Sequence, residues 1–271
     1  MRVIITGGGT AGHINPALAI AQTIREKHKE AQILYVGTPG GMEARLVPEA
    51  GFDFMPFEAR GFMRNKISLR NIEYNVKAVG NLMTSTRRAT KILEDFRPDV
   101  AVGTGGYVTG PLLRTAAKMG IPTATHESNA APGITTKLLA KSVDVVLLAT
   151  DAACAHLPQG CKTVVTGNPV REAFIYTDRA QARRELGIPD DLFCLLSFGG
   201  SLGAKRINEA IADVIAWHLK TESIHHIHAT GRYGVDYLPE LLQKRGVTVE
   251  GHPHLVIREY IDDMPRCFAA A

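Results

Sequence analysis

Two similar glycine-rich turns, about 190 residues apart, place the strongest constraint on how this chain folds. The first turn, residues 8–12, follows an apolar run at residues 3–5, and the second, residues 199–203, follows an apolar run at residues 193–196. A helix-like stretch follows each turn, so backbone N–H groups at a helix N-terminus can face an anion. The sequence therefore predicts two similar domains around one cleft and a phosphorylated ligand.

Strand-like and helix-like segments alternate along the first half of the chain. Apolar runs of strand length fall at residues 3–6, 33–36, 100–103, 123–126 and 143–148. Their alternation with helical stretches predicts parallel βαβ units and hence an α/β fold. Asn15 followed by Pro16 predicts a first helix that is capped by Asn15 and runs over residues 17–27.

Turn-forming residues at Gly167, Asn168 and Pro169 predict a domain boundary. We expect an N-terminal domain over residues 1–166 and a C-terminal domain over residues 167–271. The chain has 271 residues and 45% hydrophobic content, which is enough to fill two cores. The second series of strands and helices falls at residues 193–197, 205–218, 224–229 and 237–244. That series is short for a doubly wound domain, so the C-terminal domain is expected to be incomplete.

The modest net charge of +4 is concentrated in one segment. Residues 60–91 contain eight basic side chains against the single acid Glu73, a local charge of +7. Four apolar residues in this segment have the spacing of an amphipathic helix, namely Ile72, Val76, Val79 and Met83. The helix either packs on a sheet with its cations solvated or contacts an anionic membrane. Nucleic acid is disfavoured because no binding motif accompanies the charge.

Other patterns exclude several classes of protein. Met1 and Arg2 lead directly into a strand-like run, and no apolar stretch reaches the roughly 20 residues of a membrane span. We therefore expect neither a cleaved signal nor a spanning helix, and a chain that stays in the cytosol. The four cysteines are dispersed without a CxxC pair, which argues against a disulfide framework or a zinc site.

Two further motifs suggest ligands but are weak. Gly7, Gly9 and Gly12 satisfy the GxGxxG pattern, yet no acidic residue follows the second strand to hold the ribose of NAD. An NAD-dependent dehydrogenase is therefore disfavoured. Alternation along a strand places His226 and His228 on one face, but no acidic or cysteine ligand lies nearby in the sequence, so no metal site is expected.

Several ordered segments together resemble the MurG family of peptidoglycan glycosyltransferases. They lie at residues 7–17, 105–111, 126–133, 166–171, 199–204 and 260–264. The resemblance implies a GT-B fold, in which two Rossmann-like domains face each other across a cleft. It also implies transfer of N-acetylglucosamine from UDP-GlcNAc to the muramoyl sugar of lipid I, which forms lipid II without a cofactor or a metal. The N-terminal domain would take lipid I at the anionic inner leaflet, as a peripheral protein on the cytoplasmic face of the membrane.

The same resemblance implies roles for individual residues. The donor would contact Thr10, Ala11 and Gly12, with Asn129 at its sugar, Arg171 and Ser201 at its diphosphate, and Ile261 at its uracil. The acceptor diphosphate would contact Gly105, Gly106 and Tyr107. The alternative for these last glycines is an ordinary strand-to-helix turn in which they serve packing.

Two residues compete for the role of catalytic base. His13 lies in the first glycine loop, where a donor sugar should approach, and imidazole can take up a proton near neutral pH. Glu127 is the competing candidate. His126, beside the end of a strand, is expected to be a structural hydrogen-bonding residue.

One departure from the family pattern keeps other functions open. This sequence stops soon after residues 260–264, where the family continues for roughly a quarter of its length with residues that hold the nucleotide. A non-catalytic binding module that keeps the acceptor and membrane surface is therefore one alternative. Another GT-B enzyme, or a UDP-sugar epimerase, is a second alternative.

Overall fold

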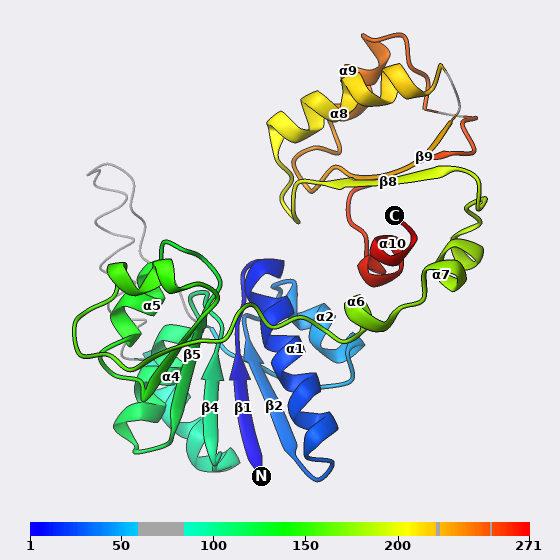
Figure 1. The fold of residues 1–271 in the computed structure, drawn as a ribbon. Helices are drawn as coiled ribbons and strands as arrows, with labels where there is room; N and C mark the ends of the chain where they lie inside the picture. Colours follow the sequence, from blue (N-terminus) through cyan, green and yellow to red (C-terminus); the bar gives the residue numbers. More distant parts are fainter. Residues whose placement is uncertain (59–83, 221–222, 250) are drawn as a thin grey trace, which may run out of the picture. The chain divides into compact units, whose positions relative to one another are not determined.

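The computed structural model describes residues 1–58, 84–220, 223–249 and 251–271. The chain forms two compact units, Met1–Arg171 (unit 1) and Glu172–Ala271 (unit 2), each described here by itself. Each unit has a parallel sheet with helices on both faces (Figure 1). The predicted α/β fold with Rossmann-like units is thereby confirmed. Most of the basic segment lies outside the described residues, so its amphipathic helix stays a prediction.

The described residues of unit 1 form a seven-stranded parallel sheet in the order β3-β2-β1-β4-β5-β6-β7. Its strands are β1 (Arg2–Thr6), β2 (Gln32–Gly37), β3 (Asp53–Pro56), β4 (Val100–Gly103), β5 (Thr123–Glu127), β6 (Val145–Leu148) and β7 (Thr163–Val165). The helices are α1 (Ala11–Lys27), α2 (Glu43–Glu49), α4 (Thr109–Lys118), α5 (Ile134–Leu139) and the 3₁₀ helix η1 (Asp151–His156), and residues 84–96 are also helical. The strand order reverses between β1 and β4, as in a doubly wound fold.

Alternate residues of β1 build the two cores of unit 1. Val3 and Ile5 pack with α1 and α2 on one face, whereas Ile4 packs with α4, α5 and the helical residues 84–96 on the other. All three side chains are 0% exposed. Burial of each contributes about 1.5 to 3 kcal/mol, and this alternation fixes the register of the central strand.

The start of α1 differs from the sequence prediction. The helix begins at Ala11, its N-cap is Thr10, and Pro16 lies inside it. Asn15 is therefore not the cap. The reason is that the Thr10 carbonyl accepts hydrogen bonds from the amides of His13 and Ile14, so the first turn forms ahead of the proline.

Unit 2 contains a three-stranded parallel sheet among its described residues, in the order β10-β9-β8. The elements are α6 (Ala173–Tyr176), α7 (Arg179–Leu186), β8 (Phe193–Phe198), α8 (Lys205–His218), β9 (Ile224–Ala229), α9 (Leu238–Gln243), β10 (Leu255–Arg258) and α10 (Met264–Ala270). One core joins α7 and α10 to the sheet, and a second core joins α8 and α9 to its other face. Figure 1 shows this layering around β8 and β9.

Candidate active site at the glycine-rich loops

The carboxyl ends of β1 and β4 bring two predicted glycine loops together. Thr6 at the end of β1 pairs with Gly103 at the end of β4, so the loops that follow leave the sheet side by side. This is also where the strand order reverses. Ligands of open α/β sheets bind in the crevice at such a point. The geometry of unit 1 therefore places a candidate site at these loops.

The two loops pack directly on each other. The Gly8 amide donates to the Gly105 carbonyl at 3.3 Å, and a Cβ on Gly106 would collide with the Gly8 carbonyl. A Cβ on Gly105 would lie 2.6 Å from Nδ1 of His13. Both Gly105 and Gly106 also have a positive φ. Packing alone thus requires these two glycines. Contact of Gly105, Gly106 and the exposed Tyr107 with an acceptor diphosphate stays a prediction.

His13 is held in one orientation by Thr104. The carbonyl of Thr104 lies 2.9 Å from Nδ1 of His13, and because a carbonyl only accepts, this nitrogen must carry the hydrogen. The Thr104 hydroxyl donates back to the His13 carbonyl at 2.6 Å. Within the described part of the chain, Nε2 of His13 makes no hydrogen bond and keeps its lone pair. The ring is therefore set to accept a proton at Nε2.

A buried carboxylate lies behind the first glycine loop. Glu43 is 0% exposed and accepts hydrogen bonds from the Gly9 amide at 3.3 Å and the Thr38 amide at 3.0 Å. A carbonyl and a carboxylate thus already accept from the Gly8 and Gly9 amides, which leaves the amides at the N-terminus of α1 as those that can face an anion. Cβ atoms on Gly37 and Gly41 would collide with the Glu43 side chain, so these glycines leave the space that it occupies.

Tyr35 also holds the first glycine loop in place. Its hydroxyl donates to the Gly7 carbonyl at 2.7 Å, and its ring is 0% exposed. Burial, with a smaller contribution from the charge of Glu43, raises the pKa of Tyr35 above its usual value of 10.0. The hydroxyl thus stays protonated and remains a donor. Like Glu43 and Thr104, this residue was missed by the sequence analysis.

The backbone amides at the N-terminus of α1 are the hydrogen-bond donors that remain available to a ligand at this loop. The first amides of a helix have no intrahelical acceptor, and the helix dipole places partial positive charge there. The Thr10 side chain does not cap α1, and the first turn contains no acidic residue. Thr10 and Ala11 are half-buried and Gly12 is exposed. This arrangement suits the predicted donor contacts of these three residues.

Glu127 holds the loop after β5. Its carboxylate accepts from the Asn129 amide at 3.0 Å and side chain at 2.8 Å, from the Gly133 amide at 2.9 Å, and from the Thr136 hydroxyl at 2.6 Å. Burial raises the pKa of Glu127, but these four hydrogen bonds outweigh it, so the pKa lies below its usual value. A carboxylate stabilised in this way is a weak base, and the geometry favours His13 for that role.

The other predicted residues lie elsewhere in the two units. Arg171 is the last residue of unit 1 and is half-buried. Ser201 lies in the glycine loop of unit 2, and its carbonyl accepts from the Arg232 amide at 3.1 Å. The side chain of Ile261 is 2% exposed and belongs to the core of unit 2. A uracil contact by Ile261 would therefore use its backbone. Arg171 thus belongs to unit 1, whereas Ser201 and Ile261 belong to unit 2, and their contacts with the donor stay predictions.

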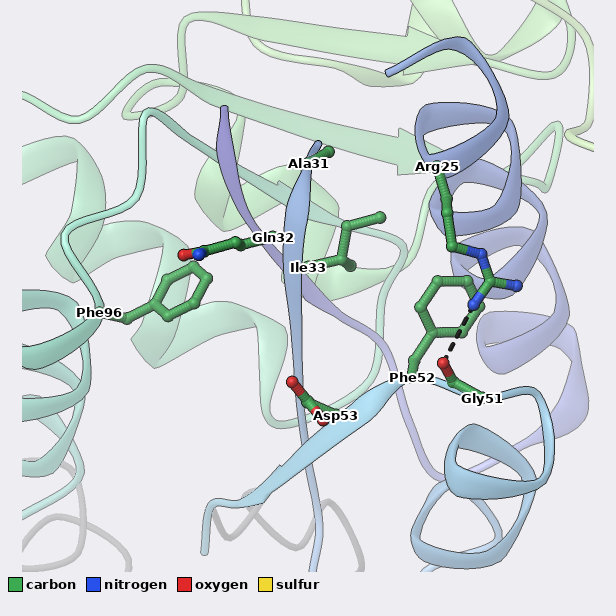
Figure 2. A pocket seen from close by; sticks show the side chains of 8 residues that line it. All are labelled: Arg25, Ala31, Gln32, Ile33, Gly51, Phe52, Asp53 and Phe96. Carbon is green, nitrogen blue, oxygen red and sulfur yellow. Dashed lines mark hydrogen bonds between the residues drawn. The ribbon is translucent and has the colours of Figure 1, made fainter. Parts of the chain in front are cut away.

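The cavity in Figure 2 lies at the other end of the unit 1 sheet. It has a volume of about 370 Å³ and is bordered by the first residues of β2 and β3, Gln32 and Asp53. Arg25 donates to the Gly51 carbonyl at 3.0 Å and covers the Phe52 ring at 4.0 Å (Figure 2). Because the amino ends of parallel strands are not where such sheets bind substrates, this cavity is not the candidate site.

Comparison with known proteins identifies the family. The profile of the glycosyltransferase family 28 N-terminal domain matches residues 3–148. The crystal structure of Acinetobacter baumannii MurG matches with a TM-score of 0.60 and 27% identity, covering 100% of this chain and 71% of that one. A curated relative from Acetivibrio thermocellus is 43% identical over 271 residues, with the same coverage of each chain. The chain belongs to the MurG family of glycosyltransferases.

The curated MurG-family relatives share one descriptive name. The proteins from Acetivibrio thermocellus and from Desulforudis audaxviator, the second 41% identical, are both named UDP-N-acetylglucosamine--N-acetylmuramyl-(pentapeptide) pyrophosphoryl-undecaprenol N-acetylglucosamine transferase. The chain spans 71% of the length of each. A UDP-GlcNAc 2-epimerase from Methanocaldococcus jannaschii has a TM-score of 0.62 at 15% identity, with coverage of 99% and 76%, and shares the fold alone.

Proposed function

We propose that this chain carries out the MurG-family reaction, the transfer of N-acetylglucosamine from UDP-GlcNAc to the muramoyl sugar of lipid I. The observation that carries the proposal is family membership along the whole chain, at 43% identity to a relative with this activity in its name. The fixed orientation of His13 at the paired glycine loops is consistent with it. Unit 1 would bind the acceptor and unit 2 the UDP portion of the donor.

The proposed reaction is a single displacement with inversion at the sugar. The acceptor hydroxyl attacks the anomeric carbon of the α-linked UDP sugar, and its proton passes to Nε2 of His13. The bond to the diphosphate breaks as the new β linkage forms, and UDP leaves with the bonding electrons. Arg171 and the amides around Ser201 would stabilise the charge that develops on the diphosphate.

Binding without transfer is the second candidate. It is favoured by the small sheet of unit 2, which has three strands among the described residues. A sheet of this size provides fewer strand ends to surround a nucleotide than the seven strands of unit 1. Such a module would keep the acceptor surface but fail to hold UDP-GlcNAc, so donor binding separates the two candidates.

Calorimetric titration of the 271-residue chain with UDP-GlcNAc tests the proposal. We expect binding, and we expect Arg171→Ala to weaken it about tenfold or more, because a hydrogen bond to a charged group contributes about 1.5 to 3 kcal/mol. Arg184→Ala is the matched control, since Arg184 is exposed on α7. Absence of heat with the unchanged chain would favour the binding module. Equal affinity of the unchanged chain and Arg171→Ala would remove that residue from the donor site.

A peripheral position on the inner membrane leaflet is part of the same proposal. Among the described residues, no helix is both long and apolar enough to cross a bilayer. Support for surface contact comes from the local charge of +7 in residues 60–91. On α5, the apolar side chains of Ile134 and Leu138 are 47% and 73% exposed, and Lys137 belongs to the same helix. Apolar and basic groups together suit an anionic lipid surface.

Vesicle binding tests the membrane contact. The double variant Val76→Glu, Met83→Glu adds two charges to the apolar stripe, and loss of about 1.5 to 3 kcal/mol per apolar side chain predicts at least tenfold weaker binding to anionic vesicles. Co-sedimentation measures the bound fraction, with uncharged phosphatidylcholine vesicles as the control lipid. Equal sedimentation of the variant and the unchanged chain would show that the stripe packs within the protein.

A further inference from the structure

Three buried histidines, a half-buried serine and a buried asparagine form a continuous hydrogen-bonded chain inside unit 2. His218 Nε2 lies 2.9 Å from His226 Nδ1, and His226 Nε2 lies 2.7 Å from Ser197 Oγ. Ser197 Oγ lies 2.8 Å from His228 Nδ1, and His228 Nε2 lies 3.1 Å from Asn208 Oδ1. The three rings and Asn208 are 0% exposed. The proposed transfer reaction makes no use of this histidine chain.

The sequence placed His226 and His228 on one face of a strand, which the structure bears out, but their partners come from α8 and β8. Among the described residues, no group of three or more histidine, cysteine or acidic side chains is arranged to hold a metal ion. The ring nitrogens instead bond to one another and to neutral groups. The cluster is therefore a hydrogen-bonded network.

One pattern of protons satisfies every link of the histidine chain. The Asn208 amide nitrogen donates to the Thr230 carbonyl, so its oxygen faces His228 and Nε2 of that ring must carry a hydrogen. Nδ1 of a neutral His228 then accepts from the Ser197 hydroxyl, whose oxygen accepts from Nε2 of His226. Nδ1 of His226 accepts in turn from Nε2 of His218. All three rings are neutral in this pattern.

A further proton would break the pattern. Burial lowers the pKa of all three rings, and for His226, burial and the other rings together lower it to about 3. A proton on Nδ1 of His228 would point at the Ser197 carbonyl, 3.1 Å away, and would displace the serine hydroxyl as donor. The pKa values of the three rings in the intact histidine chain lie below the ordinary value of 6.5, so a disrupted histidine chain binds protons more readily. Acidification below pH 6.5 therefore favours the disrupted state.

The groups around the histidine chain compensate only in part for such a proton: the Ser197 carbonyl raises the pKa of His228, but burial lowers it more. His225 lies on the other face of β9, and the Tyr237 hydroxyl contacts the Asn208 amide nitrogen at 2.9 Å. The charges that act on His226 are those of neighbouring histidines. The charged side chains of the surrounding α8, α9 and β10 are exposed or half-exposed, namely Lys205, Arg206, Glu209, Asp213, Glu240 and Arg258.

The asparagine end of the chain supports the second glycine loop. The Asn208 side chain donates to the Thr230 carbonyl at 2.9 Å, and a Cβ on Gly203 would collide with that same carbonyl. The next residues bind the loop directly: the Arg232 amide donates to Ser201 and the Tyr233 amide to Leu202, each at 3.1 Å. The segment 230–233 is thus the floor on which residues 199–203 rest.

We propose that Asn208, held by His228 at the end of the histidine chain, is a positioning residue for the glycine loop at residues 199–203, and that acidification releases this loop. The inference rests on the proposed function in one respect: this loop is where the donor diphosphate would bind. Neutral rings keep Asn208 turned toward Thr230, and the floor then holds the loop amides in place. Donor binding would weaken in acid through loss of this geometry.

Amide hydrogen exchange of the 271-residue chain, measured by NMR without ligand, tests the positioning role. The amides of Arg232 and Tyr233 report directly on loop contact, because they donate to the loop carbonyls. We expect Asn208→Ala to lower their protection about tenfold or more, while the amide of Ile227 in β9 keeps its protection. Unchanged protection at Arg232 and Tyr233 would overturn the proposal.

The pH arm of the experiment follows the same amides in the unchanged chain from about pH 8 to about pH 5. After correction for intrinsic exchange rates, their protection should fall below about pH 6.5, and Asn208→Ala should abolish this dependence. Constant protection across that range, or an equal pH dependence in the variant, would overturn acid release. His252→Gln is the control, because it removes a half-buried ring that lies outside the histidine chain and should leave the dependence intact.

Titration with UDP separates this inference from the proposed function. We expect UDP to bind less tightly to Asn208→Ala than to the unchanged chain, in proportion to the lost protection. If UDP binds neither protein while the exchange results are as expected, the donor site is refuted and the positioning role stands. If UDP binds both proteins equally, the loop position does not control the nucleotide and the inference fails.

Discussion

Replacing His13 with glutamine is expected to lower the rate of sugar transfer by about 10²- to 10⁴-fold, the usual contribution of a positioned general base. The structure gives the reason: the bond from Nδ1 to the Thr104 carbonyl leaves the Nε2 lone pair to accept the proton of the acceptor hydroxyl. Glutamine fills similar space but is not a useful base. Transfer of labelled sugar from UDP-GlcNAc to lipid I, measured at saturating donor, gives the rate.

The control for His13 comes from the same helix. His28 is the exposed C-cap residue of α1, and His28→Gln should leave the transfer rate unchanged. A proton-accepting role also requires that His13→Gln bind UDP-GlcNAc nearly as well as the unchanged chain. A variant that loses donor affinity in proportion to its rate would show that His13 is a ligand for the donor. A variant with full activity would exclude it as the base.

Glu127→Gln is expected to destabilise unit 1 by about 3 kcal/mol. Each carboxylate oxygen of Glu127 accepts from two donors. In the variant, the side-chain NH₂ group of glutamine replaces one of these oxygens and faces two donors without an acceptor. The loop of residues 128–133 and the start of α5 would lose a common anchor. Denaturant unfolding measures the loss in the free energy of unfolding, and amide exchange in β5 reports on the same region. Glu94→Gln, at an exposed position, should change stability by no more than about 0.5 kcal/mol.

The pH dependence gives this prediction a second test. The pKa of Glu127 in the folded chain lies below its usual 4.5, so its contribution is complete above 4.5 and is lost as pH falls through the folded-state pKa. The difference in stability between the unchanged chain and Glu127→Gln should therefore narrow in acid. A difference that stays constant down to the acid limit of folding would show that the charge is not what stabilises the loop.

The strands could be predicted from the sequence because a buried strand appears there as a short run of apolar residues. The run at residues 3–6 is apolar on both faces because helices cover both sides of β1, and short apolar runs of this kind are typical of such strands. The length of α8 was likewise confirmed at residues 205–218. The start of α1 was not, because the local preference of Asn15 and Pro16 was weaker than the turn that Thr10 initiates.

The candidate site was only partly predictable, because its supports come from distant segments. His13 and the glycines were visible as a motif. Glu43 was not, because a glutamate at the start of a short helix resembles any surface acid until Gly9 and Thr38 close around it. The same holds for Ser197, whose place between two histidines of β9 depends on the register of β8 against β9. No local pattern encodes that register.

The groups behind the two glycine turns give these turns different electrostatic surroundings. The buried carboxylate of Glu43 accepts the Gly9 amide, so a dianion entering the first turn would meet like charge in a poorly screened interior. A hydroxyl-rich, uncharged sugar would not. The second turn rests on a floor held by neutral Asn208, which repels no phosphate. Two similar glycine motifs thus differ in their electrostatic surroundings.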